Sequence, residues 1–281
     1  MKPIEKSYTF LGGKPAGEAS LEDVRKSPGV RVGSYAELVE KVAELSFNNP
    51  EYLLFFRGQA RDYHDRNLTT IQTPIFRSKP NGRLGTSEID GRFQVLDRAE
   101  EALANRYKLP GKERVQRFSI LRWALLQHYV VCQTPLLDIT HSLRVACSFA
   151  FQEKQDECFL YVLGFPQISG SVTTSSEHGI QVVRLLSICP SAALRPHYQE
   201  GYLVGEFPSI SFRQKKLYDR VELDMANRLV CKFRLGNYED FWQSGFTEIP
   251  REALFPDHRD ILKKDMDKIR SVIEEFFRSQ T

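Results

Sequence analysis

Hydrophobic and polar positions along this chain follow two periods, one typical of helices and one typical of strands. Apolar residues recur at helical spacing from Leu38 to Leu45. Ser34 and Glu37 have the spacing of a capping box, so a short helix is predicted to begin there. The aromatic and leucine-rich run 51–56 then predicts a buried strand.

Longer helices and further strands are predicted downstream. Apolar residues at spacings of three and four predict helices over residues 90–107, 115–129, 142–151 and 260–278. Aliphatic or alternating runs predict strands over residues 134–139, 158–165, 181–188 and 229–235. Loops rich in Gly, Pro, Ser and Thr are predicted over residues 78–90 and 166–180. This order predicts an α+β fold with a central mixed β-sheet flanked by helices.

The last predicted helix has an apolar face that is continuous over four turns. Such a face must be covered, either by the domain's own sheet or by a partner or second subunit. The residues on it are Leu262, Met266, Ile269, Ile273 and Phe276.

The chain is predicted to form a single domain preceded by an arm. Residues 1–30 are rich in Gly, Pro, Lys and Ser, which is typical of a flexible N-terminal segment. Residues 31–281 contain no Pro/Ser-rich linker that would separate two halves. We therefore expect a flexible arm over residues 1–30 and one domain over residues 31–281.

Composition excludes several classes of protein. The 281 residues are 41% hydrophobic and carry a formal net charge of +3. Basic and acidic residues alternate, so no basic block indicates nucleic-acid binding, although a local basic patch stays open. No apolar stretch approaches the ~20 residues of a membrane span, and residues 1–18 lack the apolar core of a signal peptide. We therefore expect a cytoplasmic protein with no membrane contact.

The five cysteines are scattered and form no C-x-x-C pair, so they predict reduced core thiols. No metal-binding triad is visible, and phosphate-binding glycine loops and a G-x-S-x-G elbow are absent. Kinases, P-loop NTPases and serine hydrolases therefore lack support.

Arg57 follows the predicted buried strand directly and is followed by Gly58 and Gln59. A guanidinium at such a position is costly to bury without a partner. Either it binds a diphosphate or carboxylate of a ligand, or it pairs with Asp138 or another acid of the protein. Gly58 allows a close backbone approach, which a ligand or a tight turn would need.

A second group of polar residues ends the next predicted strand. Asp138, Thr140 and Ser142 alternate, so on an extended segment their side chains share one face. Either they form a polar wall over a ligand near a helix N-terminus, or Thr140 or Ser142 caps the helix while Asp138 accepts hydrogen bonds. One residue can cap while another contacts ligand.

Three further residues are candidates for a role in catalysis. His128 ends an apolar helix and is either a general base or a core histidine that donates to a backbone carbonyl. Gln199 cannot act as a base but can orient a hydroxyl or a water. Glu200 is a base if its side chain faces inward, and otherwise a solvated acid.

Several segments, in order, resemble motifs of the FRG-domain family. Residues 56–59 (Phe-Arg-Gly-Gln) give that family its name, and residues 73–77 follow. Residues 126–129, 136–142 and 145–150 resemble the family's His-Tyr, Asp and Ala-x-x-Phe-Ala segments. Residues 195–202 and 254–257 resemble its later motifs. The loop 130–135 and Ile139 depart from the usual Gly-x-Pro-Thr-Arg and Trp of the family.

The order of these motifs is also similar to the Arg–Ser–Glu plan of mono-ADP-ribosyltransferases. This resemblance implies an ADP-ribosyltransferase-like fold and an NAD-dependent enzyme, a bacterial toxin or a defence effector. It implies that Arg57 holds a phosphate or ribose of NAD and that Gln199 or Glu200 orients the acceptor. The NAD-binding residues would be Arg57, Gly58, Gln59, His128, Asp138, Thr140 and Ser142.

The alternative function is a non-catalytic module that senses a nucleotide or nucleic acid in the same cleft.

We therefore expect Arg57, Asp138, Thr140 and Gln199 to line one concave site, because polar residues lie at strand ends in each motif. The acceptor is an unknown macromolecule, and the oligomeric state does not follow from the sequence.

Overall fold

The computed structural model describes residues 1–12, 15–78, 84–208, 223–243 and 245–278. The chain divides into two compact units, each built from three segments. Unit 1 comprises Met1–Ile71, Ile139–Ile168 and Asp224–Leu254, and unit 2 comprises Gln72–Asp138, Ser169–Leu223 and Phe255–Thr281. Residues 1–30 belong to unit 1, and the single domain predicted over residues 31–281 stays a prediction.

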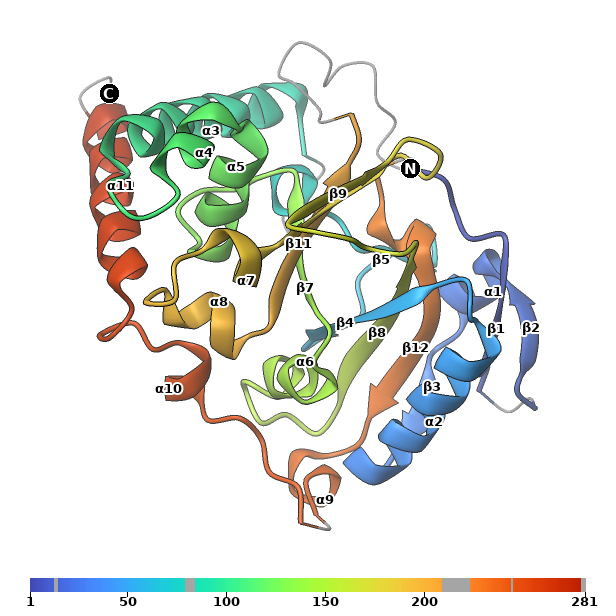
Figure 1. Ribbon diagram of the computed structural model, residues 1–281. Helices are drawn as coiled ribbons and strands as arrows, with labels where there is room; N and C mark the ends of the chain where they lie inside the picture. The colour runs from blue at the N-terminus through green and yellow to red at the C-terminus, as the bar shows by residue number, and fades with distance from the viewer. Residues whose placement is uncertain (13–14, 79–83, 209–222, 244, 279–281) are drawn as a thin grey trace. The chain divides into compact units, whose positions relative to one another are not determined.

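Unit 1 is built around a mixed sheet. Its strand order is β3 (Val30–Val32), β12 (Leu229–Leu235), β8 (Cys158–Phe165), β4 (Leu53–Gln59) and β7 (Leu136–Thr140). Only the last two residues of β7 belong to this unit. Strands β3 and β12 are parallel, and the other neighbours are antiparallel. Figure 1 shows β4, β8 and β12 lying side by side.

Helix α6 (Leu143–Ala150) packs on β4 through small and apolar residues. Leu54 and Phe56 of β4 lie in one buried cluster with Ala146 and Ala150 of α6. The same cluster receives Leu38 from α2 (Tyr35–Asn48), whose N-cap is Ser34, as the capping-box spacing predicts. Unit 1 also holds β5 (His64–Asp65), β6 (Leu68–Thr69), η3 (Met225–Arg228), α9 (Tyr238–Phe241) and α10 (Arg251–Leu254).

Residues 1–30 do not form the loosely docked arm that their composition predicts. They form β1 (Lys6–Thr9), β2 (Gly17–Ser20) and α1 (Leu21–Lys26), with residues 13 and 14 outside the described part. Ile4 and Val24 are buried, and the Arg25 guanidinium donates to Asp224 at 2.7 Å. The reason is tertiary, because a segment poor in hydrophobic residues is held here by a few buried anchors and a buried ion pair.

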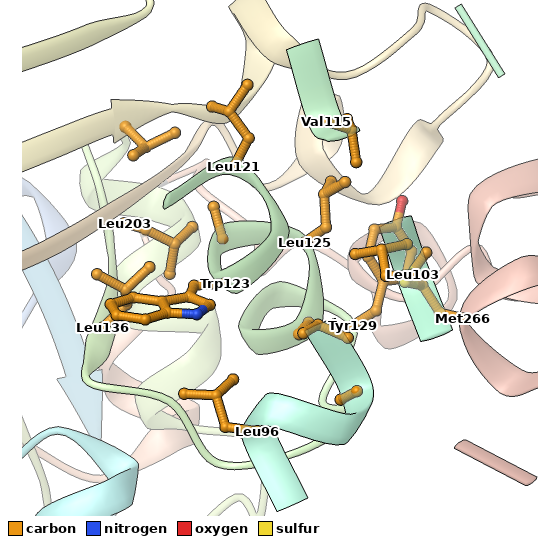
Figure 2. Close-up of a cluster of buried hydrophobic side chains, with 14 of the residues drawn as sticks. Leu96, Leu103, Val115, Leu121, Trp123, Leu125, Tyr129, Leu136, Leu203 and Met266 are labelled. Carbon is orange, nitrogen blue, oxygen red and sulfur yellow. The ribbon is translucent and has the colours of Figure 1, made fainter. Parts of the chain in front are cut away.

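Unit 2 combines antiparallel strands with a helical layer. The first three residues of β7 are followed in strand order by β11 (Gly201–Glu206), β10 (Ile180–Arg184) and β9 (Val172–Ser175). The helical segments are η1 (Pro74–Phe76), α3 (Thr86–Arg106), α4 (Lys112–Arg117), α5 (Ser119–His128), α7 (Leu185–Ile188), α8 (Leu194–Tyr198) and α11 (Ile261–Arg278). Figure 2 shows their core, in which Tyr129 and Leu136 lie with Leu103 of α3 and Met266 of α11.

The α+β class and the mixed sheet are confirmed, while two element boundaries and the packing of α11 differ from the predictions. The helix predicted over residues 115–129 is two helices that meet at Phe118, which is extended with φ −115°. The strand predicted over residues 181–188 ends at Arg184, where α7 begins. The apolar face of α11 is covered within unit 2 by α3 rather than by the sheet.

Candidate functional site

Asp138 is the centre of a polar cluster in unit 2. Its Oδ2 accepts a hydrogen bond from the Gln127 side-chain amide at 2.9 Å, and its Oδ1 lies 3.1 Å from His128 Nδ1. Both partners stand at the C-terminal end of α5, and Asp138 stands on β7. The cluster therefore forms where a helix end meets a strand, and both carboxylate oxygens are held while 38% of the side chain is exposed.

Thr134 fixes the orientation of the Gln127 amide. The Thr134 hydroxyl is buried and donates to Gln127 Oε1 at 2.9 Å. The oxygen of the amide is thereby occupied, so its nitrogen is directed to Asp138. Thr134 belongs to the segment in which this sequence departs from the FRG pattern, so here that segment supports the cluster.

His128 is almost fully buried, with 2% of its side chain exposed. Its Nδ1 faces Asp138, while its Nε2 is buried and has no hydrogen-bond partner among the described residues. A Cβ on Gly201 would lie 3.1 Å from the imidazole Cε1, so glycine at this position leaves room for the ring. The arrangement is that of a histidine that donates from Nδ1 and holds Asp138 in place.

Arg195 forms hydrogen bonds with residues of two other sequence segments, His128 in one and Asp257 and Asp260 in the other. Its guanidinium donates to the backbone oxygen of His128 at 3.0 Å and to Asp257 at 2.7 Å. Its backbone amide donates to Asp260 at 2.8 Å, and Asp260 also accepts from the Tyr129 hydroxyl at 2.8 Å. Burial and the neighbouring Asp260 raise the pKa of the Tyr129 phenol, so it stays a donor.

The two candidates that follow Arg195 differ in exposure. Gln199 is buried, with 7% exposed, and caps the C-terminus of α8. Glu200 is exposed and adopts a positive φ of 44°. Glu200 therefore meets solvent, while Gln199 lies in the interior of unit 2.

Arg57 and Thr140 in unit 1 project from opposite faces of their sheet. Thr140 is paired directly with Phe56, so these two side chains share one face. Arg57 is the next residue along β4 and points to the other face. We expected Arg57 and Thr140 to line one concave site, but the register of β4 and β7 directs these two side chains to opposite faces.

Thr140 and Ser142 are engaged at the start of α6. The Thr140 hydroxyl accepts from the Ser142 amide at 3.0 Å, and the Ser142 hydroxyl accepts from the Val145 amide. The capping role that the sequence left open is therefore confirmed. Gly58 faces α6, where a Cβ would lie 1.9 Å from the Ala146 oxygen, so its close approach serves helix packing.

Arg57 belongs to a polar row that the sequence analysis missed. Tyr161 of β8 lies directly opposite Arg57, and Lys232 of β12 lies directly opposite Tyr161. Asp62 accepts from Tyr161 at 2.9 Å and from the fully buried Lys232 ammonium at 2.5 Å. Burial and Asp62 raise the pKa of Tyr161, and Arg57 opposes that rise. A lysine in an apolar strand was the available signal, but its partner is 170 residues away.

Residues 53–158 match the model of the FRG domain. The chain contains an FRG domain. This FRG match covers Arg57, His128 and Asp138, while Arg195 and Gly201 lie beyond it, although both contact His128. No curated protein and no solved structure matches the chain.

Among the described residues, no helix is both long and apolar enough to cross a bilayer. Over the same residues, no group of three or more His, Cys, Asp or Glu side chains is arranged to hold a metal ion. All five cysteines are free, and four of them are buried.

Proposed function

We propose that this FRG protein is an NAD-dependent ADP-ribosyltransferase-like enzyme in which Asp138 faces the ribose of NAD. The observation that carries the proposal is that Asp138 is held at both oxygens, by Gln127 and His128, yet keeps 38% of its side chain exposed. A carboxylate with a fixed position and an open face is suited to meet a developing positive charge.

The chemistry would place that charge on the ribose. The bond between ribose C1′ and the nicotinamide nitrogen breaks, and nicotinamide leaves with the bonding electrons. The remaining ribose is oxocarbenium-like, and a preorganised carboxylate stabilises it without reorganising. The acceptor nucleophile then bonds to C1′ and releases its proton, and exposed Glu200 is the proposed base.

The neighbouring residues would position rather than react. His128 has its Nε2 buried, so we assign it to holding Asp138 rather than to proton transfer. Buried Gln199 is proposed to orient a ribose hydroxyl or the acceptor. Arg57, with Gly58 and Gln59 beside it, lies in unit 1 on the sheet face opposite Thr140. Its predicted role as a phosphate ligand is therefore proposed separately from the role of Asp138, and the NAD affinity of an Arg57→Ala variant tests it.

The decisive experiment uses NAD labelled separately in the nicotinamide and in the adenylate phosphate. The enzyme is expected to release labelled nicotinamide and to transfer the adenylate label to a macromolecule in a cell extract. Asp138→Asn keeps the size of the side chain but removes the charge, and it should lower the rate at least about 100-fold. Asp156→Asn, the same change at an exposed acid, is the matched control and should leave the rate unchanged.

The same experiment tests the alternative of a non-catalytic nucleotide- or nucleic-acid-sensing module. Binding of NAD in calorimetry without nicotinamide release would favour that alternative. An Asp138→Asn protein that turns over at the wild-type rate would refute the role of Asp138. For the proposed role as a toxin or defence effector, growth of cells that express wild type and Asp138→Asn is compared, and only the wild type should arrest growth.

A further inference from the structure

Five cationic side chains gather where α3 ends and along α4. They lie within fifteen residues, 104–118, that contain one acid, Glu113, so this segment has a formal net charge of +4. The whole chain has +3, and the rest of it therefore carries a net charge of −1. We call this cluster the basic surface; all of its members are exposed, and they are Arg106, Lys108, Lys112, Arg114 and Arg117.

The cations of the basic surface differ from their neighbours in how they are paired within the described part of the chain. None of the five forms an ion pair with a residue that the structure describes. Elsewhere in unit 2, Arg92 pairs with Glu88 one turn away, and Lys263 pairs with Asp267 in the same way. Charges that are not neutralised locally are available to an external anion, and their field is strongest where several lie together.

The backbone that carries the basic surface is held in place by buried residues and by a hydrogen bond. Tyr107 and Val115 are buried, with 1% and 2% exposed, and both belong to the main core of unit 2. The Gln116 amide donates to the backbone oxygen of Ala104 at 3.1 Å and so joins α4 to the end of α3. The cations therefore project from a packed support, and Figure 1 shows α3 and α4 close together.

An exposed aromatic ring stands at the end of the basic surface. Phe118 separates α4 from α5 and is 44% exposed. The Arg117 guanidinium lies 5.2 Å from the centre of its ring, so charge and π-face are presented together. Flexible bases stack on such rings while cations track the phosphates, which is the usual recognition of single strands.

We infer that the basic surface, with Phe118, binds single-stranded nucleic acid. The cations contact backbone phosphates, and the ring stacks with an unpaired base. A duplex or a lipid surface matches the charge but offers no unpaired base to Phe118. The inference does not rest on the enzymatic proposal, since it concerns α3, α4 and Phe118 rather than Asp138.

The test is fluorescence anisotropy with a labelled 20-nucleotide single strand of mixed sequence, as DNA and as RNA, titrated at several salt concentrations. The triple variant Lys112→Ala/Arg114→Ala/Arg117→Ala is expected to bind at least about ten-fold more weakly at low salt. Its slope of log affinity against log salt should fall by about 2, because each phosphate contact in a single strand contributes roughly 0.7. Phe118→Ala should weaken binding about five-fold or more while leaving the slope unchanged.

A matched pair of charge reversals provides the control. Arg114→Glu/Arg117→Glu and Lys264→Glu/Lys268→Glu change the net charge equally, and the second pair lies on exposed positions of α11. Only the first pair should abolish binding, with thermal melts showing that both variants stay folded. Equal loss in both pairs, no binding by the wild type at low salt, or tighter binding to a duplex or to anionic phospholipid vesicles would overturn the inference.

Discussion

The Ala146 carbonyl oxygen lies 1.9 Å from the position that a Cβ on Gly58 would take. Strand β4 can therefore approach α6 only because residue 58 has no side chain. The glycine next to Arg57 thus serves the packing of unit 1, and a substitution there has a defined structural cost.

Gly58→Ala should destabilise the protein by about 3 kcal/mol, because backbone of α6 must move to accept the methyl group. Gly91→Ala is the matched control, since Gly91 lies within α3 and its Cβ would meet nothing within 4 Å. Alanine there should stabilise the protein by about 1 kcal/mol through helix propensity. Urea unfolding of both variants checks this, and equal effects would contradict the packing argument.

Arg195→Met should destabilise by about 3 kcal/mol, because it removes a buried guanidinium that pairs with Asp257 and leaves the His128 oxygen without its donor. Asp257→Asn should cost less than about 1 kcal/mol, since 49% of the Asp257 side chain is exposed and an amide oxygen still accepts. Thermal melts should therefore rank the two variants clearly. A larger loss from Asp257→Asn would show that the ion pair is not centred on Arg195.

Stability should fall at alkaline pH through Cys231. Burial raises the pKa of its thiol from 9.0 to about 11. Between these values the unfolded chain loses the proton while the folded chain keeps it, so the contribution is complete below pH 9 and is lost as pH rises through 11. The loss is about 1.4 kcal/mol per pH unit in this window.

Cys231→Ala isolates this effect. The free energy of unfolding of the wild type, minus that of the variant, should decrease from pH 9 to pH 11 when measured by urea titration at each pH. A difference that stays constant with pH would mean that the thiol does not contribute.

Removal of α11 should cause aggregation, because its apolar face covers α3 within unit 2. A chain that ends at Pro256 is expected to precipitate or form large oligomers in size-exclusion chromatography. A single change should act in the same direction, since Met266 is fully buried and Met266→Asp places a charge in the core. Lys268→Asp at an exposed position is the control, and a soluble, equally stable truncated chain would show that α11 is an appendage.

Much of the secondary structure followed from the sequence by itself, because it depends on local spacing. Ser34 caps α2, the aliphatic run at β8 is a buried strand, and Ser142 starts α6, all as the patterns predict. The FRG motifs likewise contain His128 and Asp138, which contact each other in the structure. Periodicity states which side of its own element each residue occupies, and that statement needs no partner.

Only the tertiary structure decided which residues meet. Strand register put Arg57 and Thr140 on opposite faces, and chain topology brought Arg195 to His128, 67 residues away in sequence. Chain topology likewise brings the buried Lys232 into contact with Asp62, which lies 170 residues away in sequence. A sequence pattern lacks this information, because contacts between distant segments are set by how elements dock and pair through space, and a one-residue change of register would reverse every face.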